Sequence, residues 1–347
     1  ARSLIEARFR DLTARAPVRP EPSPGEIDHH GVKVFHHYEA EAGNTQVTLE
    51  TIRRSQSLPD STVRRRERIL RDMADRIVQD RLDARLNKPN PPFTDAAISS
   101  GRYLNVVDYA AIHAETRPSD WRAALSEVET TLRRALTHGF TEAEVERVKK
   151  DFRAGLERAV EGAPTRESND LARDIISTLN RNRVFRSPSQ DLALLSPAID
   201  SATPASLHEA LRRSWDPSHR LVLVTGNAEI GPTPETEIRA AYDKSQAVAV
   251  SPPEKARAVV FPYLDPPAAD GEIRQQTRIE DLDITQVDFA NGLRLNLKPT
   301  DFKAQEIQVR LIFGEGRSSE PADRPGLGPV SEAVITESGL GQLNRDE

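Results

Sequence analysis

Two neighbouring stretches decide the fold: residues 288–302, DFANGLRLNLKPTDF, and residues 314–341, GEGRSSEPADRPGLGPVSEAVITESGLG. Polar and apolar residues alternate over residues 292–295 and again over residues 308–311, which predicts two half-buried strands. A turn containing glycines follows, and then a helix that begins near Gly326. The predicted order is therefore strand, strand, turn and helix.

The same order occurs near the start of the chain. Residues 31–34 (GVKV) match residues 292–295 (GLRL), and residues 46–49 (QVTL) match residues 308–311 (QVRL). Half-buried strands look alike for physical reasons, so this match alone is weak evidence. It gains weight because a turn and a helix follow each pair. We interpret the two stretches as copies of one architecture, the second truncated.

This order resembles the repeating domain of the pitrilysin/insulinase family of zinc metalloendopeptidases, the inverzincins. In that family the helix carries His-x-x-Glu-His, whose histidines bind zinc and whose glutamate polarises the attacking water. The matching positions here are Pro329, Glu332 and Ala333. Proline and alanine side chains cannot bind a metal, and the last histidine is His219, so no shift of the alignment restores the site.

We therefore predict no catalytic residue and no metal ligand in this chain, and no cofactor bound by it. Glu332 is interpreted as a solvated carboxylate in the first turn of a helix, where the helix dipole favours negative charge. Pro329 then occupies a first-turn position that tolerates proline.

The resemblance covers most of the chain and implies its domain organisation. An N-terminal helix would end a preceding catalytic domain, and a proline-rich linker would lead into an inactive peptidase-like domain. A connector would then join it to the truncated start of a further such domain. The predicted segments are the helix at residues 1–16, the linker at 17–30, the inactive domain at 31–230, the connector at 231–283 and the start of the further domain at 284–347.

Strands and helices fall into separate groups, which indicates an α+β fold. The patterns predict strands within residues 31–36, 46–49, 103–116 and 220–226, and helices at residues 60–87, 121–136, 141–156, 168–180 and 204–214. The expected architecture is a two-layer domain with an antiparallel-rich sheet packed against helices, in a metallohydrolase-like tandem repeat. Residues 231–280 show many prolines and little periodicity, so we expect a connector docked on the surface through residues 259–263.

Composition limits the classes of function. The chain has 347 residues, a net charge of −6 and no cysteine, which excludes disulfides and thiolate sites. The basic run at residues 64–66 is followed by Glu67, Asp72 and Asp75, and this mixture is typical of a solvated helix face rather than a phosphate-binding stripe. Nucleic-acid binding is therefore disfavoured, and no stretch is apolar enough to span a membrane.

Other candidate sites are weak. Four histidines flank the first strand: His29, His30, His36 and His37. Side chains of neighbouring residues on a strand point to opposite faces, so at most alternate histidines could meet at one metal ion. His113 and Glu115 share a face and form a candidate hydrogen-bonded couple. Asp108 and Glu115 fall on opposite faces. His138 is expected at a helix C-terminus, where the dipole favours an imidazolium.

The resemblance implies a function. The chain would be the non-catalytic, substrate-chamber portion of a zinc-dependent metalloendopeptidase, expected to be part of a longer polypeptide because it opens at Ala1 inside a helical pattern. Zinc would lie in the upstream catalytic domain of that polypeptide, and peptides would be the other partners. The alternative is a catalytically inactive scaffold or assembly protein of the same fold. A periplasmic or otherwise exported location agrees with the family.

Two strands and one helix leave an open sheet edge and an unburied apolar face. We therefore expect residues 284–343 to pack against residues 31–230 or to pair with a second chain in a homodimer.

Overall fold

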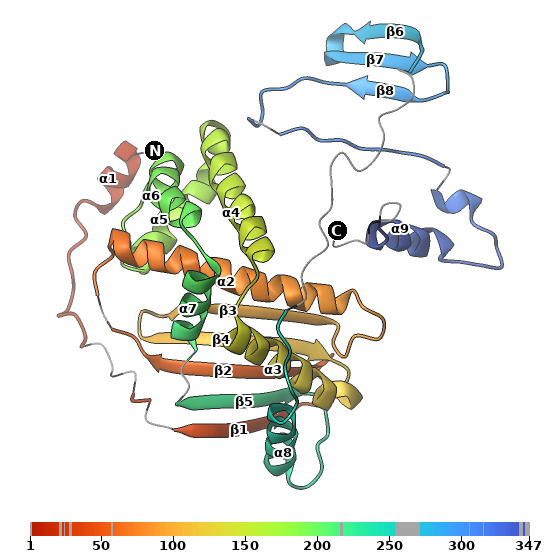
Figure 1. Cartoon of the computed structure of the whole chain (residues 1–347). Coiled ribbons are helices and arrows are strands. Elements are labelled where there is room, and N and C mark those ends of the chain that lie inside the picture. Colours follow the sequence, from red (N-terminus) through yellow and green to blue (C-terminus); the bar gives the residue numbers. More distant parts are fainter. Residues whose placement is uncertain are drawn as a thin grey trace.

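The computed structural model describes residues 2–20, 23, 25–27, 30–56, 58–215, 218–253, 271–304, 306–314, 316–339 and 343. Its main body is a five-stranded sheet with helices packed on one face (Figure 1). The strands of this sheet are β1 (Gly31–Tyr38), β2 (Thr45–Arg54), β3 (Asp95–Tyr103), β4 (Val107–Thr116) and β5 (His219–Gly226). Their spatial order is β1-β5-β2-β4-β3.

The last strand in sequence, β5, lies between the first two. It pairs in parallel with β1, from Gly31 opposite His219 to Tyr38 opposite Gly226, and antiparallel with β2. The pairs β2–β4 and β3–β4 are antiparallel as well. The prediction of an antiparallel-rich sheet packed against helices is thus confirmed.

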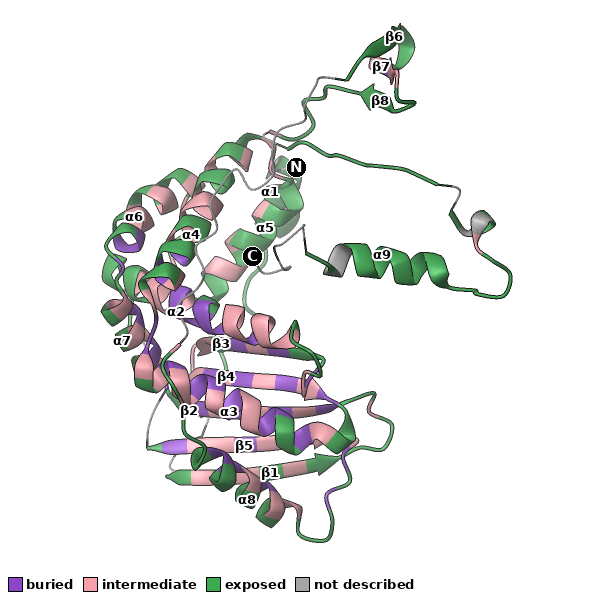
Figure 2. Ribbon diagram, turned by 45° about the vertical axis from the view of Figure 1, so that its right-hand side comes forward, coloured by how far each residue is buried: buried purple, intermediate pink, exposed green. Residues whose placement is uncertain are grey.

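Besides these strands, the described part of the main body contains seven α-helices: α2 (Thr62–Leu86), α3 (Trp121–His138), α4 (Glu142–Gly162), α5 (Ser168–Asn180), α6 (Pro188–Asp200), α7 (Pro204–Ser214) and α8 (Pro234–Gln246). Helices α2, α3 and α8 contact the sheet, whereas α4, α6 and α7 pack onto α2. Figure 2 shows the buried residues concentrated where these layers meet. A short helix, α1 (Arg2–Phe9), precedes the main body.

The core follows from alternation along the strands. Buried and half-buried residues alternate along β2, so Val47 and Leu49 lie beneath the helices, as do Ala110 and Ile112 on β4. Met73 and Ile77 of α2 and Leu125 and Val128 of α3 complete the same cluster without exposed surface. The helices predicted at residues 60–87 and 121–136 therefore bury the faces that their periodicity indicated.

Helix α4 begins with a capping box. The Thr141 hydroxyl accepts a hydrogen bond from the Glu144 amide at 3.3 Å, and the Glu144 carboxylate accepts one from the Thr141 amide at 2.7 Å. Arg81 of α2 donates to the same carboxylate at 2.8 Å and to the Gly139 carbonyl at 2.9 Å. One ion pair thus ties α2 to the turn between α3 and α4.

The extended stretch predicted at residues 103–116 was wrong at its start. Leu104 and Asn105 have φ values of 48° and 58° and form a tight turn between β3 and β4. Strand β3 itself was not predicted, because its sequence, DAAISSGRY, is rich in small residues and has one β-branched residue, Ile98.

The stretch at residues 231–280, where the sequence shows little periodicity, contains regular structure that was not predicted. Helix α8 lies there and contacts α3, β1 and β5 through buried Ile238 and Tyr242. The ring of His138 donates to the Val250 carbonyl at 2.9 Å, which fixes the segment after α8. The predicted docking residues 259–263 lie outside the described residues, and the domain boundary at residue 230 stays a prediction.

A second sheet follows, made of β6 (Ile273–Ile279), β7 (Ile284–Phe289) and β8 (Arg294–Leu297) in an antiparallel meander. Only β8 overlaps a predicted strand of the second copy. Residues 308–311 belong to no strand, and the side chains of Val309 and Leu311 are 88% and 69% exposed. The strand predicted at residues 308–311 was therefore wrong.

Residues 284–343 were expected to pack on the main body, and the structure shows one hydrogen bond between the described residues of these two parts. The Ala304 amide donates to the Thr165 hydroxyl at 3.0 Å. All residues of β8 are exposed, and the meander lies apart from the main sheet (Figure 1). For these residues the packing prediction was wrong, and pairing with a second chain stays a prediction.

The end of β5 gives a stability test. Gly226 has a φ of 111°, and a Cβ at this position would overlap the carbonyl oxygen of Asn44. We expect Gly226→Ala to lower the free energy of unfolding by about 1–3 kcal/mol, because both the backbone and the neighbouring chain must shift. The matched control is Gly155→Ala in α4, where a Cβ has free space. It should raise the free energy of unfolding by up to about 1 kcal/mol. Urea denaturation measures both, and a neutral Gly226→Ala would contradict the register of β5.

The docking of α8 gives a second test. Ile238 is fully buried, so Ile238→Ala should lower the free energy of unfolding by about 2–5 kcal/mol through lost burial and a residual cavity. Lys244→Ala, at an exposed position of the same helix, should change it by less than about 0.5 kcal/mol. Equal effects of the two substitutions in thermal or urea unfolding would show that α8 does not pack on the sheet.

Candidate functional site

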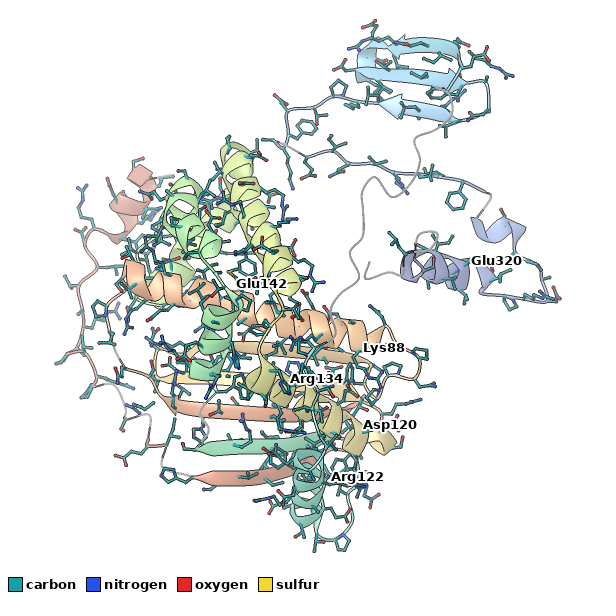
Figure 3. The ribbon with its side chains drawn as sticks, in the orientation of Figure 1. Lys88, Asp120, Arg122, Arg134, Glu142 and Glu320 are labelled. Carbon is teal, nitrogen blue, oxygen red and sulfur yellow. The ribbon has the colours of Figure 1, made fainter. Side chains whose placement is uncertain are left out.

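The predicted degenerate motif lies at the start of α9 (Leu327–Glu337). Pro329 is the third helical residue, in the first turn as predicted, whereas Glu332 lies in the second turn, so its assignment to the first turn was wrong. The amides of Gly326 and Gly328 donate to the carboxylate of Glu320 at 3.2 Å and 2.6 Å. Figure 3 shows Glu320 beside this helix. The positive end of the helix is thus already occupied by a carboxylate of the chain itself.

Helix α2 takes the corresponding place in the main body, because it follows β1 and β2 in sequence. Its sequence, TVRRRERILRDMADRIVQDRLDARL, contains no histidine. Both helices that could correspond to the zinc-binding helix thus lack imidazole ligands. Within the described residues, no group of three or more His, Asp or Glu side chains is arranged to hold a metal ion. That Pro329, Glu332 and Ala333 bind no metal ion stays a prediction.

Three histidines form hydrogen bonds to backbone carbonyls. His36 of β1 donates to Ala228 at 3.2 Å, His138 to Val250 at 2.9 Å, and His208 of α7 to Leu136 at 2.8 Å. His30 and His37 are exposed, and His29 lies outside the described residues. The histidines around β1 are therefore separated by the strand geometry.

His219 has a structural role at the start of β5. It is 6% exposed, and its Nε2 accepts a hydrogen bond from the Ile52 amide at 2.9 Å. The hydroxyl of Thr51 lies 3.0 Å from the same nitrogen. An acceptor role at Nε2 places the ring proton on Nδ1. The couple predicted between His113 and Glu115 is replaced by a bond from Asn44 to Glu115 at 2.6 Å.

The most developed cavity is a cleft of about 600 Å³ at one end of the main body. Its walls come from the start of α2, the β3–β4 hairpin, the loop between α5 and α6, and α7. Eight arginines and four carboxylates line it. We call it the arginine cleft. The sequence pattern did not predict it, because its walls are far apart in the chain: Arg53 and Arg213, for example, are 160 residues apart.

Arg68 lies in the crowded part of the cleft. Burial, followed by the charges of Arg183, Arg71 and Arg65, lowers the pKa of Arg68 to about 10. Burial and the charge of Arg181 lower the pKa of Arg183 as well. The guanidinium groups therefore repel one another in a partly dehydrated place, where such repulsion is least screened.

The loop between α5 and α6 is fixed against α2. Asp60 accepts two hydrogen bonds from Nε of Arg65, at 2.8 and 2.9 Å, and one from the Val184 amide at 3.0 Å. Burial opposes ionisation of Asp60, but these bonds and the Arg65 charge lower its pKa to about 2. Arg65 also donates to the Val184 carbonyl at 2.9 Å, and Asn105 of the hairpin donates to the Asn180 carbonyl at 2.9 Å.

Asp75 lies beneath the cleft. The hydroxyl of Ser100, a lining residue, donates to Oδ2 of Asp75 at 2.5 Å, whereas Oδ1 has no hydrogen-bond partner within the described residues. Burial is the main reason that the pKa of Asp75 is raised to about 6, against the opposing bond from Ser100. The prediction that Asp75 answers the charges of residues 64–66 was wrong, because its side chain is buried.

Known proteins match this chain in sequence and fold. A scan against models of protein families found no match. The probable zinc protease PqqL of Escherichia coli (strain K12) is 25% identical over 214 residues, which are 60% of this chain and 22% of that protein. The crystal structure of the periplasmic protease PqqL matches 99% of this chain and 38% of its own, with 18% identity and a TM-score of 0.58.

Two further structures share the fold. The ferredoxin protease FusC, in complex with Arabidopsis ferredoxin, matches 85% of this chain and 33% of its own, with 18% identity and a TM-score of 0.56. A predicted insulinase family protease from Yersinia pestis matches 71% and 53%, with 14% identity and a TM-score of 0.58. This chain is similar to insulinase-type zinc peptidases.

The insulinase-type similarity confirms the resemblance and the α+β fold expected from the sequence. The chain spans less than two thirds of each of these relatives, including about a fifth of PqqL. None of the helices in the described ranges is long and apolar enough to cross a lipid bilayer. The arginine cleft lies on the main body, on elements other than α9.

The raised pKa of Asp75 makes stability depend on pH. The carboxyl group of Asp75 has a pKa of about 6 in the folded protein, whereas an unfolded Asp has a pKa of about 3.9. Between these values the folded state binds more protons, so this group's contribution to stability falls as the pH rises from about 4 to 6. We expect Asp75→Asn to raise the free energy of unfolding at pH 7 by about 1–3 kcal/mol.

The difference between variant and wild type should shrink towards zero below about pH 4.5. Urea unfolding across this pH range provides the measurement. Glu161→Gln, at an exposed position of α4 outside the cleft, should leave the profile unchanged. A difference for Asp75→Asn that stays constant across the range would contradict the buried carboxyl as its source.

Proposed function

We propose that this chain is a non-catalytic, substrate-chamber portion of a zinc-dependent metalloendopeptidase that degrades or processes peptides. One observation carries the proposal: a main body with the insulinase-type fold has no histidine on α2, and Pro329 and Ala333 stand on α9. The fold supports a place in such a peptidase, and the residue types support the absence of catalysis. Zinc would belong to another domain of the same polypeptide.

The proposed division of the chain follows the sequence pattern. Residues 1–16 end a preceding domain, residues 17–30 link it to the inactive peptidase-like domain at 31–230, and residues 231–283 connect that domain to residues 284–347. The packing of α8 on the sheet supports a firm junction after residue 230. Such a junction allows the inactive domain to hold its position beside a catalytic domain.

The proposed partners are that catalytic domain and peptide substrates. PqqL is described as periplasmic, and FusC was crystallised with a protein, ferredoxin. By analogy we propose an exported location and a polypeptide substrate for the protein to which this chain belongs. The main sheet and its helices would form part of the wall around that substrate.

The purified chain should bind no stoichiometric zinc and cleave no peptide in a chelator-sensitive manner, because the part of the chain that the structure describes holds no group of three His, Asp or Glu side chains placed to bind a metal. The measurements are metal analysis after dialysis against zinc and hydrolysis of a quenched fluorescent peptide library, with and without 1,10-phenanthroline. An authentic zinc peptidase serves as the positive control. One zinc per chain at submicromolar affinity, or cleavage that the chelator abolishes, would refute the proposal.

A further inference from the structure

The arginine cleft has no part in the function proposed so far. Two of its four carboxylates pair with arginines that also line it, Asp108 with Arg102 and Glu209 with Arg213. A third, Asp60, is occupied by Arg65 and the Val184 amide. The remaining arginines therefore exceed the carboxylates available to them within the described cleft.

Six lining arginines remain, against one remaining carboxylate, Glu67. Arg53 of β2 donates to the Arg213 carbonyl. The other five are Arg64, Arg68 and Arg71 on α2, and Arg181 and Arg183 on the facing loop. Arg71 contacts Asp72 at 3.0 Å, but its Nε is buried and has no hydrogen-bond partner among the described residues. A buried guanidinium N–H without an acceptor costs free energy, and an anion in the cleft would remove that cost.

The three arginines of α2 form a row. They stand four and then three residues apart, so they share a helix face with rises of about 6 Å and 4.5 Å between them. Alternate residues of an extended peptide lie on one side, about 6.6–6.8 Å apart. A row of carboxylates at that spacing can meet successive guanidinium groups, whereas a lone small anion meets one or two.

The facing arginines are held at a set position. Arg181 and Arg183 flank Asn182, whose φ of 53° turns the loop, and the bonds to Val184 and Asn180 fix both ends of this segment. The cleft is therefore preorganised, so a ligand need not order the loop on binding.

We propose that the arginine cleft binds an acidic stretch of polypeptide, whose carboxylates accept hydrogen bonds from the guanidinium groups of α2 and of the facing loop. This inference rests on the proposed function for the identity of that polypeptide, a peptide substrate. The cleft then selects substrates by charge and holds them by a region remote from the scissile bond.

The test is fluorescence anisotropy of the 347-residue chain with a labelled octapeptide that alternates glutamate and alanine. The wild-type chain should bind it, and binding should weaken as salt rises, because exposed charge pairs are screened. A peptide with glutamine for glutamate should bind at least about tenfold more weakly, since one decade corresponds to about 1.4 kcal/mol. Arg68→Gln combined with Arg183→Gln should cause a similar loss.

Controls separate charge at the cleft from general effects. Arg274→Gln combined with Arg310→Gln removes the same charge from exposed positions outside the main body and should leave affinity within about twofold. Arg68→Lys combined with Arg183→Lys should retain part of the binding, because the charge stays and the planar fork is lost. Thermal unfolding of each variant shows whether it is folded.

Several outcomes would overturn the inference. They are equal binding of the glutamate and glutamine peptides, equal loss in the distant double variant, and unchanged affinity in the folded cleft variant. Pyrophosphate or a single-stranded oligonucleotide that binds the cleft more tightly than the peptide would show a phosphate site instead. Failure here leaves the zinc and hydrolysis results standing, and a chelator-sensitive activity would refute the proposed function without changing the peptide affinities.

Discussion

The position of β5 between β1 and β2 is the constraint on which the main body depends. Among the described strands, β1 pairs with β5 alone, and β5 separates β1 from β2. The five strands therefore form one sheet only when β5 pairs with both β1 and β2. Strand β5 begins about 165 residues after β2 ends. His219 at the start of this strand and Gly226 at its end both contact the backbone of neighbouring chain segments, so each end of the insertion has a specific fit.

The same constraint explains where sequence interpretation succeeded and failed. Helices α2 and α3 were predicted because each buries a full apolar face. Helix α8 was missed because its buried face rests on few large side chains, Ile238 and Tyr242, between proline-rich neighbours. The strand at residues 308–311 was predicted wrongly because alternation of polar and apolar residues indicates which face of a strand is buried. It does not indicate which strand would pair with it. In the main body the partner of β1 is β5, whereas β8 pairs with β7.

The candidate site shows a similar division. The sequence alone located Pro329, Glu332 and Ala333 and gave the resemblance that the comparisons support, because a motif is local. The arginine cleft could not be predicted, because Arg68 and Arg183 come together only through the packing of α2 against the loop after α5. The acidic residues near Arg64 in sequence suggested local neutralisation. In the fold Asp72 forms an ion pair with Arg71, and Asp60 forms one with Arg65. Asp75 is buried and accepts a hydrogen bond from Ser100.

A protein with a net charge of −6 has carboxylates to spare, yet it gathers arginines where few of those carboxylates reach. Burial of a guanidinium and repulsion between neighbouring ones both oppose folding, and in that order they lower the pKa of Arg68. A sequence selected for stability alone would replace one of these arginines by a neutral residue at little cost to packing. Local conflicts of this kind are expected at functional or strained sites. The surrounding negative charge also has a physical effect: it repels an acidic peptide from most of the surface, so the cleft is the place where attraction exceeds that background.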